Sequence, residues 1–548
     1  MVGEIIRLTW KKIFRTNIIS VVIISIYLIY SFYLTILAKS PEQGAGSMGG
    51  VFALLAVLLS GGLIRDEFES KQIEPFLVRI KISDIFWGKF LAVIILILVP
   101  SILIGAASFF GLILNNELST TGLILKILGR GLVITIYLAA VGFFLASQLK
   151  GVMNFVAIIV IQTFALYFSE KIFRAAELAE SGQWDKLSLK SALLLIFVPS
   201  QAKMLGWQVA LLLPVTVAFI IWTFLLFKSM ASKNNLVFTR SDSPGNPLAK
   251  ISGLRMTYRE GFLRRKSKEA LAGVDFSINP GKLTGFLGPN GAGKTTTLRI
   301  MLSFLKRDSG KVEFLTNEEK PEAKKKYKIG YLPETASLYP FLTVQETFYL
   351  MARNEGLSQE EARELSFRLA AKLGLSEYLN RRVANLSKGT RQKVAFGLAT
   401  IGRPDFLLFD EPYTGLDPII MFEIRNLILE LKEKGCTIFL SSHLLSEVER
   451  VCDEVVLIDK GKIVCAGEIG KLKTAARVWQ AIKKDSELAG QLSRLLGVEV
   501  KKESLGFFSR INLEPLLQNE ALSAALKQIP APNVEKIFLE SIGQTTSD

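Results

Sequence analysis

One nine-residue segment limits the possible folds of this chain more than any other feature. Residues 288–296 read Gly-Pro-Asn-Gly-Ala-Gly-Lys-Thr-Thr, which matches the pattern G-x-x-x-x-G-K-[ST] of a phosphate-binding loop. Such a loop joins a buried strand to a helix, and the apolar residues 283–287 directly before it predict that strand. Glycines let backbone N–H groups turn inward around phosphate oxygens, and the positive N-terminus of the following helix faces the same anion. The segment therefore predicts an α/β domain built around a bound phosphate group.

The residue types in this loop also predict what they bind. A lysine at position 294 is expected to reach the β- and γ-phosphates of a nucleotide, and the hydroxyl of Thr295 is expected to bind Mg²⁺. ATP and Mg²⁺ are thus the predicted cofactors. The candidate nucleotide ligands of the loop are Gly288, Pro289, Asn290, Gly291, Ala292, Gly293, Lys294, Thr295 and Thr296.

Two adjacent carboxylates follow a second apolar stretch. Residues 406–409 read Phe-Leu-Leu-Phe and lead into Asp410 and Glu411. Acids at the end of a buried strand are costly unless they face a metal ion or a phosphate site. Asp410 fits the carboxylate that helps to hold Mg²⁺. Glu411 is placed to activate or orient the attacking water, so we expect it to be catalytic together with Lys294.

The first half of the chain has a different character. Half of all residues are hydrophobic although 21% are charged. Six segments have the length needed to cross a hydrocarbon core of about 30 Å, and their interiors carry no Asp, Glu, Lys or Arg. We place them near 18–37, 46–64, 90–114, 130–148, 152–168 and 207–227. This pattern predicts an all-α membrane domain over residues 1–228.

Charge and amphipathicity add an orientation. An even number of spans puts the N-terminus on the same side as the predicted ATP site, in the cytosol, as an inner-membrane multi-pass protein. The net charge of +16 is typical of cytoplasmic flanks near anionic lipid and does not call for a nucleic-acid partner. Residues 3–16 present an apolar and a basic face, which indicates a helix lying along the membrane surface or simply the charged flank of the first span.

Composition also marks the domain boundaries. Residues 229–247 are rich in Ser, Asn, Gly and Pro and lack periodicity, which predicts a linker. The α/β domain then covers 248–469. A small α+β tail covers 470–548, with candidate strands at 498–502 and 507–513. The tail has either an accessory role or that of a structural cap.

Residues 386–392 read Leu-Ser-Lys-Gly-Thr-Arg-Gln, which resembles the signature motif of ATP-binding-cassette (ABC) ATPases in its LSKG form. The resemblance covers residues 250–470. It implies that Ser387 and Gly389 contact the nucleotide bound to an opposite subunit, so that the chain needs a partner, most simply a second copy of itself. It also implies that Tyr258 stacks on adenine and that Asp417 belongs to the D-loop.

Two further positions follow from the same resemblance. His443, the one histidine in the sequence, stands after a predicted strand where the family keeps a catalytic switch that senses the γ-phosphate. Glu334 stands in the Q-loop, where Gln is the usual residue, and a carboxylate there is a candidate Mg²⁺ ligand. Residues 535–539 resemble the closing helix found after many ATPase domains of this type.

The membrane half resembles the ABC type-2 permeases. An acidic cluster within 63–71 is followed by an amphipathic stretch and Gly-Lys before residue 90, as in the first cytoplasmic loop of that family. The resemblance implies that residues 65–89 couple the ATPase to the membrane helices; an ordinary charged loop is the alternative. We therefore expect a type-2 permease fused to an ABC ATPase, acting as a homodimer in lipid and exporting a hydrophobic or amphipathic substrate. The alternative is an ATP-driven mechanochemical or regulatory membrane complex that transports nothing.

Overall fold

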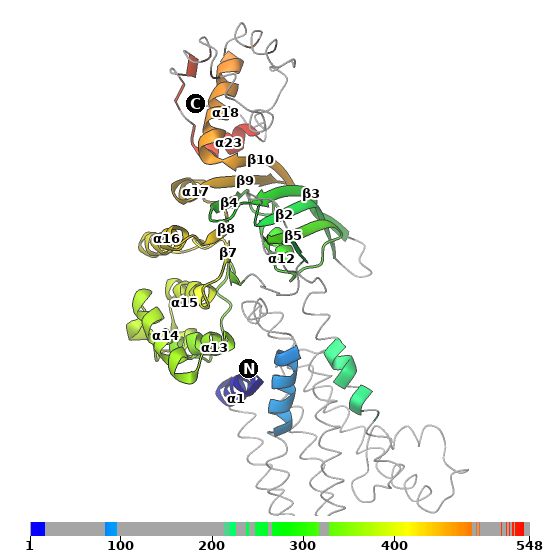
Figure 1. The fold of residues 1–548 in the computed structure, drawn as a ribbon, viewed down its shortest axis with the longest axis vertical. Helices are drawn as coiled ribbons and strands as arrows, with labels where there is room; N and C mark the ends of the chain where they lie inside the picture. The colour runs from blue at the N-terminus through cyan, green and yellow to red at the C-terminus, as the bar shows by residue number, and fades with distance from the viewer. Residues whose placement is uncertain are drawn as a thin grey trace, which may run out of the picture. The chain divides into compact units, whose positions relative to one another are not determined.

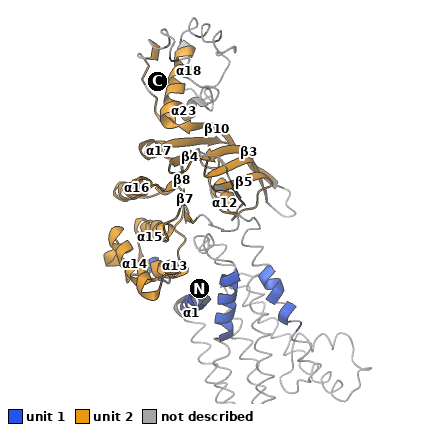
Figure 2. Cartoon of the chain, viewed as in Figure 1, with its two compact units in different colours: residues 1–231, 339–343, 382–384 blue, residues 232–338, 344–381, 385–548 orange. Residues whose placement is uncertain are grey.

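The computed structural model divides into two compact units (Figure 2). One contains residues 1–231, 339–343 and 382–384, and the other contains 232–338, 344–381 and 385–548. The structure describes residues 2–16, 83–95, parts of 214–225, 237–240, 247–260, 266–316, 328–484, 532–541 and isolated positions between 489 and 530. The predicted spans at 18–37, 46–64, 130–148 and 152–168 lie outside the described residues, as do the candidate tail strands.

Three helical pieces of the first unit are described. They are α1 (Val2–Thr16), a helix over residues 83–95 and the helical residues of 214–225. The Trp10 indole Nε1 donates to the carbonyl of Ala92 at 3.0 Å, and the rings of Phe86 and Phe224 meet edge to face at 5.2 Å. Among these described helices, none is both long enough and apolar enough to cross a bilayer. The helix at 83–95 begins seven residues before the span predicted from residue 90, so it also includes Asp84 and Lys89, which the apolar span left out.

The second unit contains two sheets (Figure 1). The six-stranded sheet has the order β10-β9-β4-β8-β7-β6, with β9 and β10 antiparallel and the other neighbours parallel. Its strands are β4 (Leu283–Leu287), β6 (Ile329–Leu332), β7 (Phe406–Asp410), β8 (Thr437–Ser442), β9 (Glu454–Asp459) and β10 (Lys462–Glu468). The residues of β4, β6, β7 and β8 are all buried, as expected for parallel strands covered on both faces.

The four-stranded sheet has the order β1-β5-β2-β3. Its strands are β1 (Val237–Arg240), β2 (Ala249–Glu260), β3 (Lys266–Ile278) and β5 (Ser309–Thr316). Strand β1 pairs parallel with β5 and lies within the range predicted as a linker, a short β-segment that composition alone did not indicate. Three stacked rings join the two sheets: Phe276 of β3, Phe286 of β4 and Phe439 of β8 have centroids 5.3–5.5 Å apart.

Helices pack against the sheets and against one another. Their bounds are α12 (Lys294–Met301), α13 (Val344–Asn354), α14 (Gln359–Lys372), α15 (Lys388–Thr400), α16 (Pro418–Glu433), α17 (Leu445–Val451), α18 (Ile469–Lys484) and α23 (Val534–Ser541), with 3₁₀ turns η3 (Ser376–Tyr378) and η4 (Val383–Asn385). Helix α12 contacts β3 and β7 and so lies between the two sheets, whereas α17 packs on β4 from the other side (Figure 1). Residues 535–539, predicted as a closing helix, lie within α23, which packs against α17, α18 and β10.

Candidate functional site

The loop between β4 and α12 can be built only with glycine at two of its positions. A Cβ atom on Gly288 would lie 2.1 Å from the carbonyl oxygen of Ile458, so a side chain there would displace backbone. Gly293 has φ of +110°, and a Cβ on it would lie 2.7 Å from the carbonyl oxygen of Ala270. Helix α12 begins immediately afterwards at Lys294. The strand, loop and helix order predicted from the sequence is therefore the order in the structure.

Lys294 lies folded back into the site. Its Nζ donates to the carbonyl of Gly288 at 2.7 Å and lies 3.1 Å from Oε1 of Glu411. Both side chains are almost fully buried, at 6% and 8% exposure. A buried ammonium is stable only when it is paired, so this carboxylate and carbonyl compensate its charge. The same Nζ is placed at the phosphate-binding loop, where an incoming anion can exchange for Glu411.

Asp410 lies at the end of β7 and is 1% exposed. Its Oδ1 accepts hydrogen bonds from the hydroxyls of Thr295 at 3.1 Å and Ser441 at 2.6 Å. Burial raises the pKa of this carboxyl to about 6, the two hydroxyls lower it in part, and the nearby charges of Glu334 and Glu411 raise it further. The sequence predicted the Asp410 and Thr295 pair, whereas the contact with Ser441 depends on the parallel register of β7 and β8.

Glu411 follows in a left-handed conformation, with φ of +49°. That turn directs its side chain back toward the end of β8, where Oε2 lies 2.7 Å from Nδ1 of His443. The backbone N–H of His443 and the hydroxyl of Thr414 reach the same oxygen at 3.3 Å each. A non-glycine residue at positive φ is strained and is kept where the surroundings fix it. Glu411 therefore lies between a lysine and a histidine that come from different parts of the chain.

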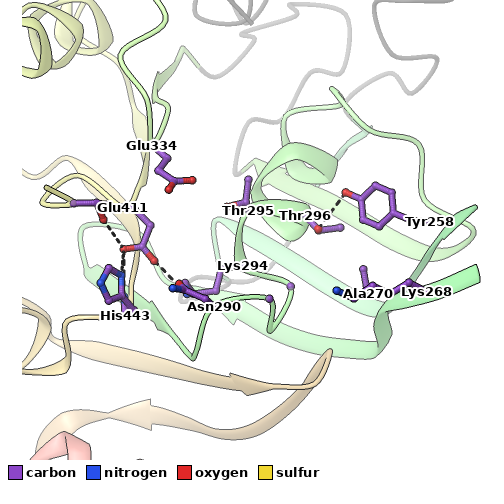
Figure 3. Close-up of a pocket in the computed structure, with 13 residues that line it drawn as sticks. Tyr258, Lys268, Ala270, Asn290, Lys294, Thr295, Thr296, Glu334, Glu411 and His443 are labelled. Atoms are coloured by element: carbon purple, nitrogen blue, oxygen red, sulfur yellow. Dashed lines mark hydrogen bonds and ion pairs between the residues drawn. The ribbon is translucent and has the colours of Figure 1, made fainter. Parts of the chain in front are cut away.

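These side chains surround one cavity of about 530 Å³ (Figure 3). Tyr258 lies at one end, with its hydroxyl 3.2 Å from that of Thr296, and Glu411 with His443 lies at the other. The predicted residues that line the cavity are Tyr258, Asn290, Gly291, Gly293, Lys294, Thr295, Thr296, Glu334, Glu411 and His443. Gly288 and Asp410 do not line the cavity themselves but contact residues that do. The carbonyl of Gly288 accepts a hydrogen bond from Lys294, and Asp410 accepts one from Thr295. Lys268, Ala270 and Thr414 also line the cavity and were not predicted; Lys268 is there because it pairs in register with Tyr258 across β2 and β3.

The signature residues are elsewhere in the same unit. Ser387 is exposed and caps α15, its Oγ accepting from the backbone N–H of Thr390 at 3.1 Å. Asp417 caps α16 in the same way, accepting from Ile420 at 2.9 Å. A Cβ on Gly389 would lie 3.1 Å from the Ile420 side chain, so α15 and α16 approach closely there. None of Ser387, Gly389 and Asp417 lines the cavity.

The donor atoms of the cavity fit a hard divalent cation. The Thr295 hydroxyl and the Asp410 carboxylate are already in contact, and the Glu334 carboxylate is near enough to raise the pKa of Asp410. Oxygen ligands of this kind, one or two of them carboxylates, are those Mg²⁺ takes beside substrate phosphates. A buried carboxyl with a raised pKa also gains from a neighbouring cation that compensates its charge.

Comparison with known proteins agrees with this geometry. The family model described as "ABC transporter" matches residues 271–414. An uncharacterized ABC transporter ATP-binding protein of Synechocystis sp. is 33% identical over 234 residues, which are 42% of this chain and 65% of that protein. The chain thus spans less than two thirds of that relative's length.

Two relatives from Bacillus subtilis are covered almost completely. The uncharacterized ABC transporter ATP-binding protein YhaQ is 32% identical over 285 residues, which are 50% of this chain and 94% of YhaQ. The linearmycin resistance ATP-binding protein LnrL is 29% identical over 305 residues, 51% of this chain and 96% of LnrL. The chain therefore belongs to the ABC transporter ATP-binding proteins, whose ATPase domain binds ATP, typically with Mg²⁺, and hydrolyses it to power transport.

Proposed function

We propose that this protein hydrolyses ATP at the cavity between Tyr258 and His443 to drive transport across the cytoplasmic membrane. The observation that carries the proposal is that a P-loop lysine, a hydroxyl–carboxylate pair and a carboxylate–histidine pair meet around that single cavity. They come from three separate stretches of sequence: the P-loop, the adjacent Asp410 and Glu411, and His443. Such convergence of a cation, metal-binding oxygens and a candidate base is what phosphoryl transfer requires.

Each side chain has a role that its contacts support. Lys294 leaves Glu411 for the β- and γ-phosphates when ATP enters, because the phosphates offer it more negative charge. Thr295 and Asp410 would hold Mg²⁺, which would supply positive charge to the phosphate oxygens. Glu411, released from Lys294, accepts a proton from the attacking water. His443 donates to Glu411 or to the γ-phosphate and so orients the base.

A second copy of the chain is the partner we propose. P-loop residues line the cavity, whereas Ser387 and Asp417, which cap α15 and α16, and Gly389, in the first turn of α15, do not. One P-loop and one signature per chain then give two complete sites when two copies meet head to tail. In each site the ATP held by one copy contacts the signature of the other.

The membrane role rests on the first unit and on the family. Large apolar side chains on its described helices are exposed, among them Ile221, Trp222 and Leu225 at 53–58%. Such exposure suits contact with lipid. We propose six spans per chain, a cytosolic N-terminus and ATPase domain, and export of a hydrophobic or amphipathic substrate. The name of the relative LnrL, a resistance protein, favours export of such a compound.

Coupling between ATP and the membrane is proposed through two segments. Glu334 follows β6 and borders the cavity, so it responds directly to the nucleotide. Residues 65–89 resemble the coupling loop of type-2 permeases. We propose that closure of two ATPase domains on ATP moves the Glu334 region and that residues 65–89 pass this movement to the helices.

The test is the ATPase rate of the purified full chain in lipid vesicles, measured with panels of lipids, amphipathic drugs and peptides. Lys294→Ala is the control that removes the phosphate contact. Stimulation by one class, absent from the control, identifies the cargo class. A wild-type rate equal to that of Lys294→Ala would reject ATP hydrolysis, and a rate that no compound alters would favour the mechanochemical alternative.

A further inference from the structure

The short helix α17 connects the catalytic histidine to the C-terminal region. Only Leu444 separates His443 from α17, and the Leu444 N–H donates to the Ser442 hydroxyl at 2.9 Å, which keeps this junction tight. Val448 packs directly on β4: a Cβ on Gly285 would lie 2.4 Å from its methyl group. A movement of α17 therefore displaces His443.

α17 does not fix its own position. It has seven residues, and no side chain caps its N-terminus. A helix this short is unstable by itself in water. Its place is set by the side chains that hold it from outside, and these come from two directions.

On one side α17 is held by α16. Arg425 Nε donates to Glu447 Oε2 at 2.8 Å, and both side chains are mostly buried, at 17% and 11% exposure. Lys432 binds Asp453 just beyond the helix, at 2.7 Å. Asp417 caps the N-terminus of α16, so one end of this arrangement reaches the predicted D-loop.

On the other side α17 is held by the C-terminal region, and Glu449 makes both contacts. Its carboxylate forms an ion pair with Lys473 of α18 and accepts a hydrogen bond from the backbone N–H of Val534, the first residue of α23, at 3.1 Å. A carboxylate at a helix N-terminus also interacts favourably with the helix dipole. The Lys473 and Val534 contacts lower the pKa of Glu449 against the opposing effect of burial, so the group is charged at neutral pH.

The helices that bind Glu449 are themselves anchored. Val534 and Ile537 of α23 are each 1% exposed, and Arg477 of α18 donates to the carbonyl of Ile529 at 2.9 Å. The C-terminal helices thus form a packed body, and Glu449 is the charged group through which that body contacts α17 (α17, α18 and α23 in Figure 1).

We propose that the C-terminal region sets the position of His443 through Glu449, which makes Glu449 a positioning residue for ATP hydrolysis. The region that the sequence left as an accessory or a cap then acts on the catalytic site: displacing α18 and α23 moves α17 and weakens the contact between His443 and Glu411. The inference rests on the proposed ATPase function for its effect on turnover, whereas the link from Glu449 to His443 is testable without any activity.

The substitution Glu449→Gln keeps the shape and removes the charge. We expect kcat to fall by about 10-fold, since a small misplacement of a catalytic group has effects of this size or larger. KM for ATP stays within about twofold because Lys294 and the other P-loop groups proposed to hold the phosphates are unchanged. Glu430→Gln is the matched control. It removes an α16 carboxylate that pairs with Lys372 at 2.7 Å and with Lys434, away from α17, so it leaves kcat unchanged.

Two further measurements separate positioning from loss of structure. In a His443→Ala background, Glu449→Gln has no further effect on the residual kcat if it acts through that histidine. Amide hydrogen exchange of the full chain rises at residues 443–451 in Glu449→Gln and not in Glu430→Gln. An equal loss of kcat in both backgrounds, or unchanged exchange at 443–451, would overturn the proposal. Wild-type protein no faster than Lys294→Ala would instead reject the ATPase function, and the exchange result would still decide the link.

Discussion

The two parts of the chain expected to contact ATP differ in how they are held. Around the P-loop, Lys294, Asp410 and Glu411 are buried, and direct side-chain contacts join Lys294 to Glu411 and Asp410 to Thr295. At the signature and the D-loop, Ser387 and Asp417 are exposed, and their described hydrogen bonds lie within the first turns of the helices that they cap. The first part is organised before any ligand arrives. In the second, neither Ser387 nor Asp417 lines the described cavity.

This difference agrees with the proposal that a second copy completes the site. Groups that are buried and charged must be compensated inside the chain, and the P-loop side achieves this with its own residues. Exposed caps at helix N-termini are solvated, and in the proposed dimer they would receive the anion that a second copy brings. Substitutions on the two sides should therefore fail in different ways.

The largest effect is expected from Glu411→Gln on the P-loop side. The amide keeps the shape but cannot accept the proton of the attacking water, so kcat falls by about 10³-fold. ATP still binds, because Lys294 remains. Steady-state hydrolysis and nucleotide binding of the same preparation check both statements, and an undiminished rate would remove Glu411 from its catalytic role.

On the signature side, Ser387→Asp separates helix capping from contact with the nucleotide of a second copy. Aspartate caps a helix as well as serine does, so α15 is retained, but a carboxylate now faces the γ-phosphate of the partner's ATP. We expect a loss of about 10²-fold in kcat with nucleotide binding by the single chain unchanged. A parallel loss of nucleotide binding to the isolated chain would show that both halves of the site lie in one copy.

Co-expression of two inactive variants tests directly whether the P-loop of one copy works with the signature of the other. Lys294→Ala and Ser387→Asp chains each inactivate both sites of their own homodimer. A heterodimer of the two has one site with an intact P-loop and an intact signature, so co-expression restores activity. Co-expressed chains that remain as inactive as either parent would contradict the shared site.

Asp410→Asn tests how much the buried carboxylate on the P-loop side lowers the stability of the folded protein. Because the pKa of Asp410 is raised from 3.8 to about 6, its contribution to stability is fully present below pH 3.8 and is lost as the pH rises through about 6. A shift of about two units at 1.4 kcal/mol each limits the loss to about 3 kcal/mol. Nucleotide-free Asp410→Asn protein should therefore gain stability over wild type more at pH 8 than at pH 5. Melting curves at the two pH values check this, and an equal difference at both would show that Asp410 does not carry a buried charge.

The smallest effect is expected from Tyr258→Ala at the far end of the cavity. Loss of the ring that is expected to stack on adenine weakens ATP binding by about 10-fold. Tyr258→Phe keeps the ring and removes only the hydroxyl contact with Thr296, so it should bind nearly as well as wild type. Titration with a fluorescent ATP analogue distinguishes the two variants, and equal losses would assign the effect to the hydroxyl.

Local pattern predicted much of the site because its motifs are contiguous. The order of strand, loop and helix around residues 283–301 follows from one segment, and the strand ending in Asp410 follows from another. The sequence did not predict three residues of the site: Ser441, Thr414 and Lys268. None belongs to a recognisable motif, and each is brought to the site by strand register or by a turn. The assignment of 229–247 as linker missed β1, whose four residues become a strand only by pairing with β5.

By itself the sequence determined the chemistry available to this protein: a phosphate-binding loop, two carboxylates, one histidine and a signature, each recognisable because its residues are neighbours along the chain. Only the tertiary structure decided which of them meet. Parallel pairing of β7 with β8 brings Asp410 to Ser441, and the left-handed turn at Glu411 directs its carboxylate between Lys294 and His443. The reason is physical: a buried charge must find a partner, and the partner is supplied by whichever strand packs alongside, wherever it lies in the sequence.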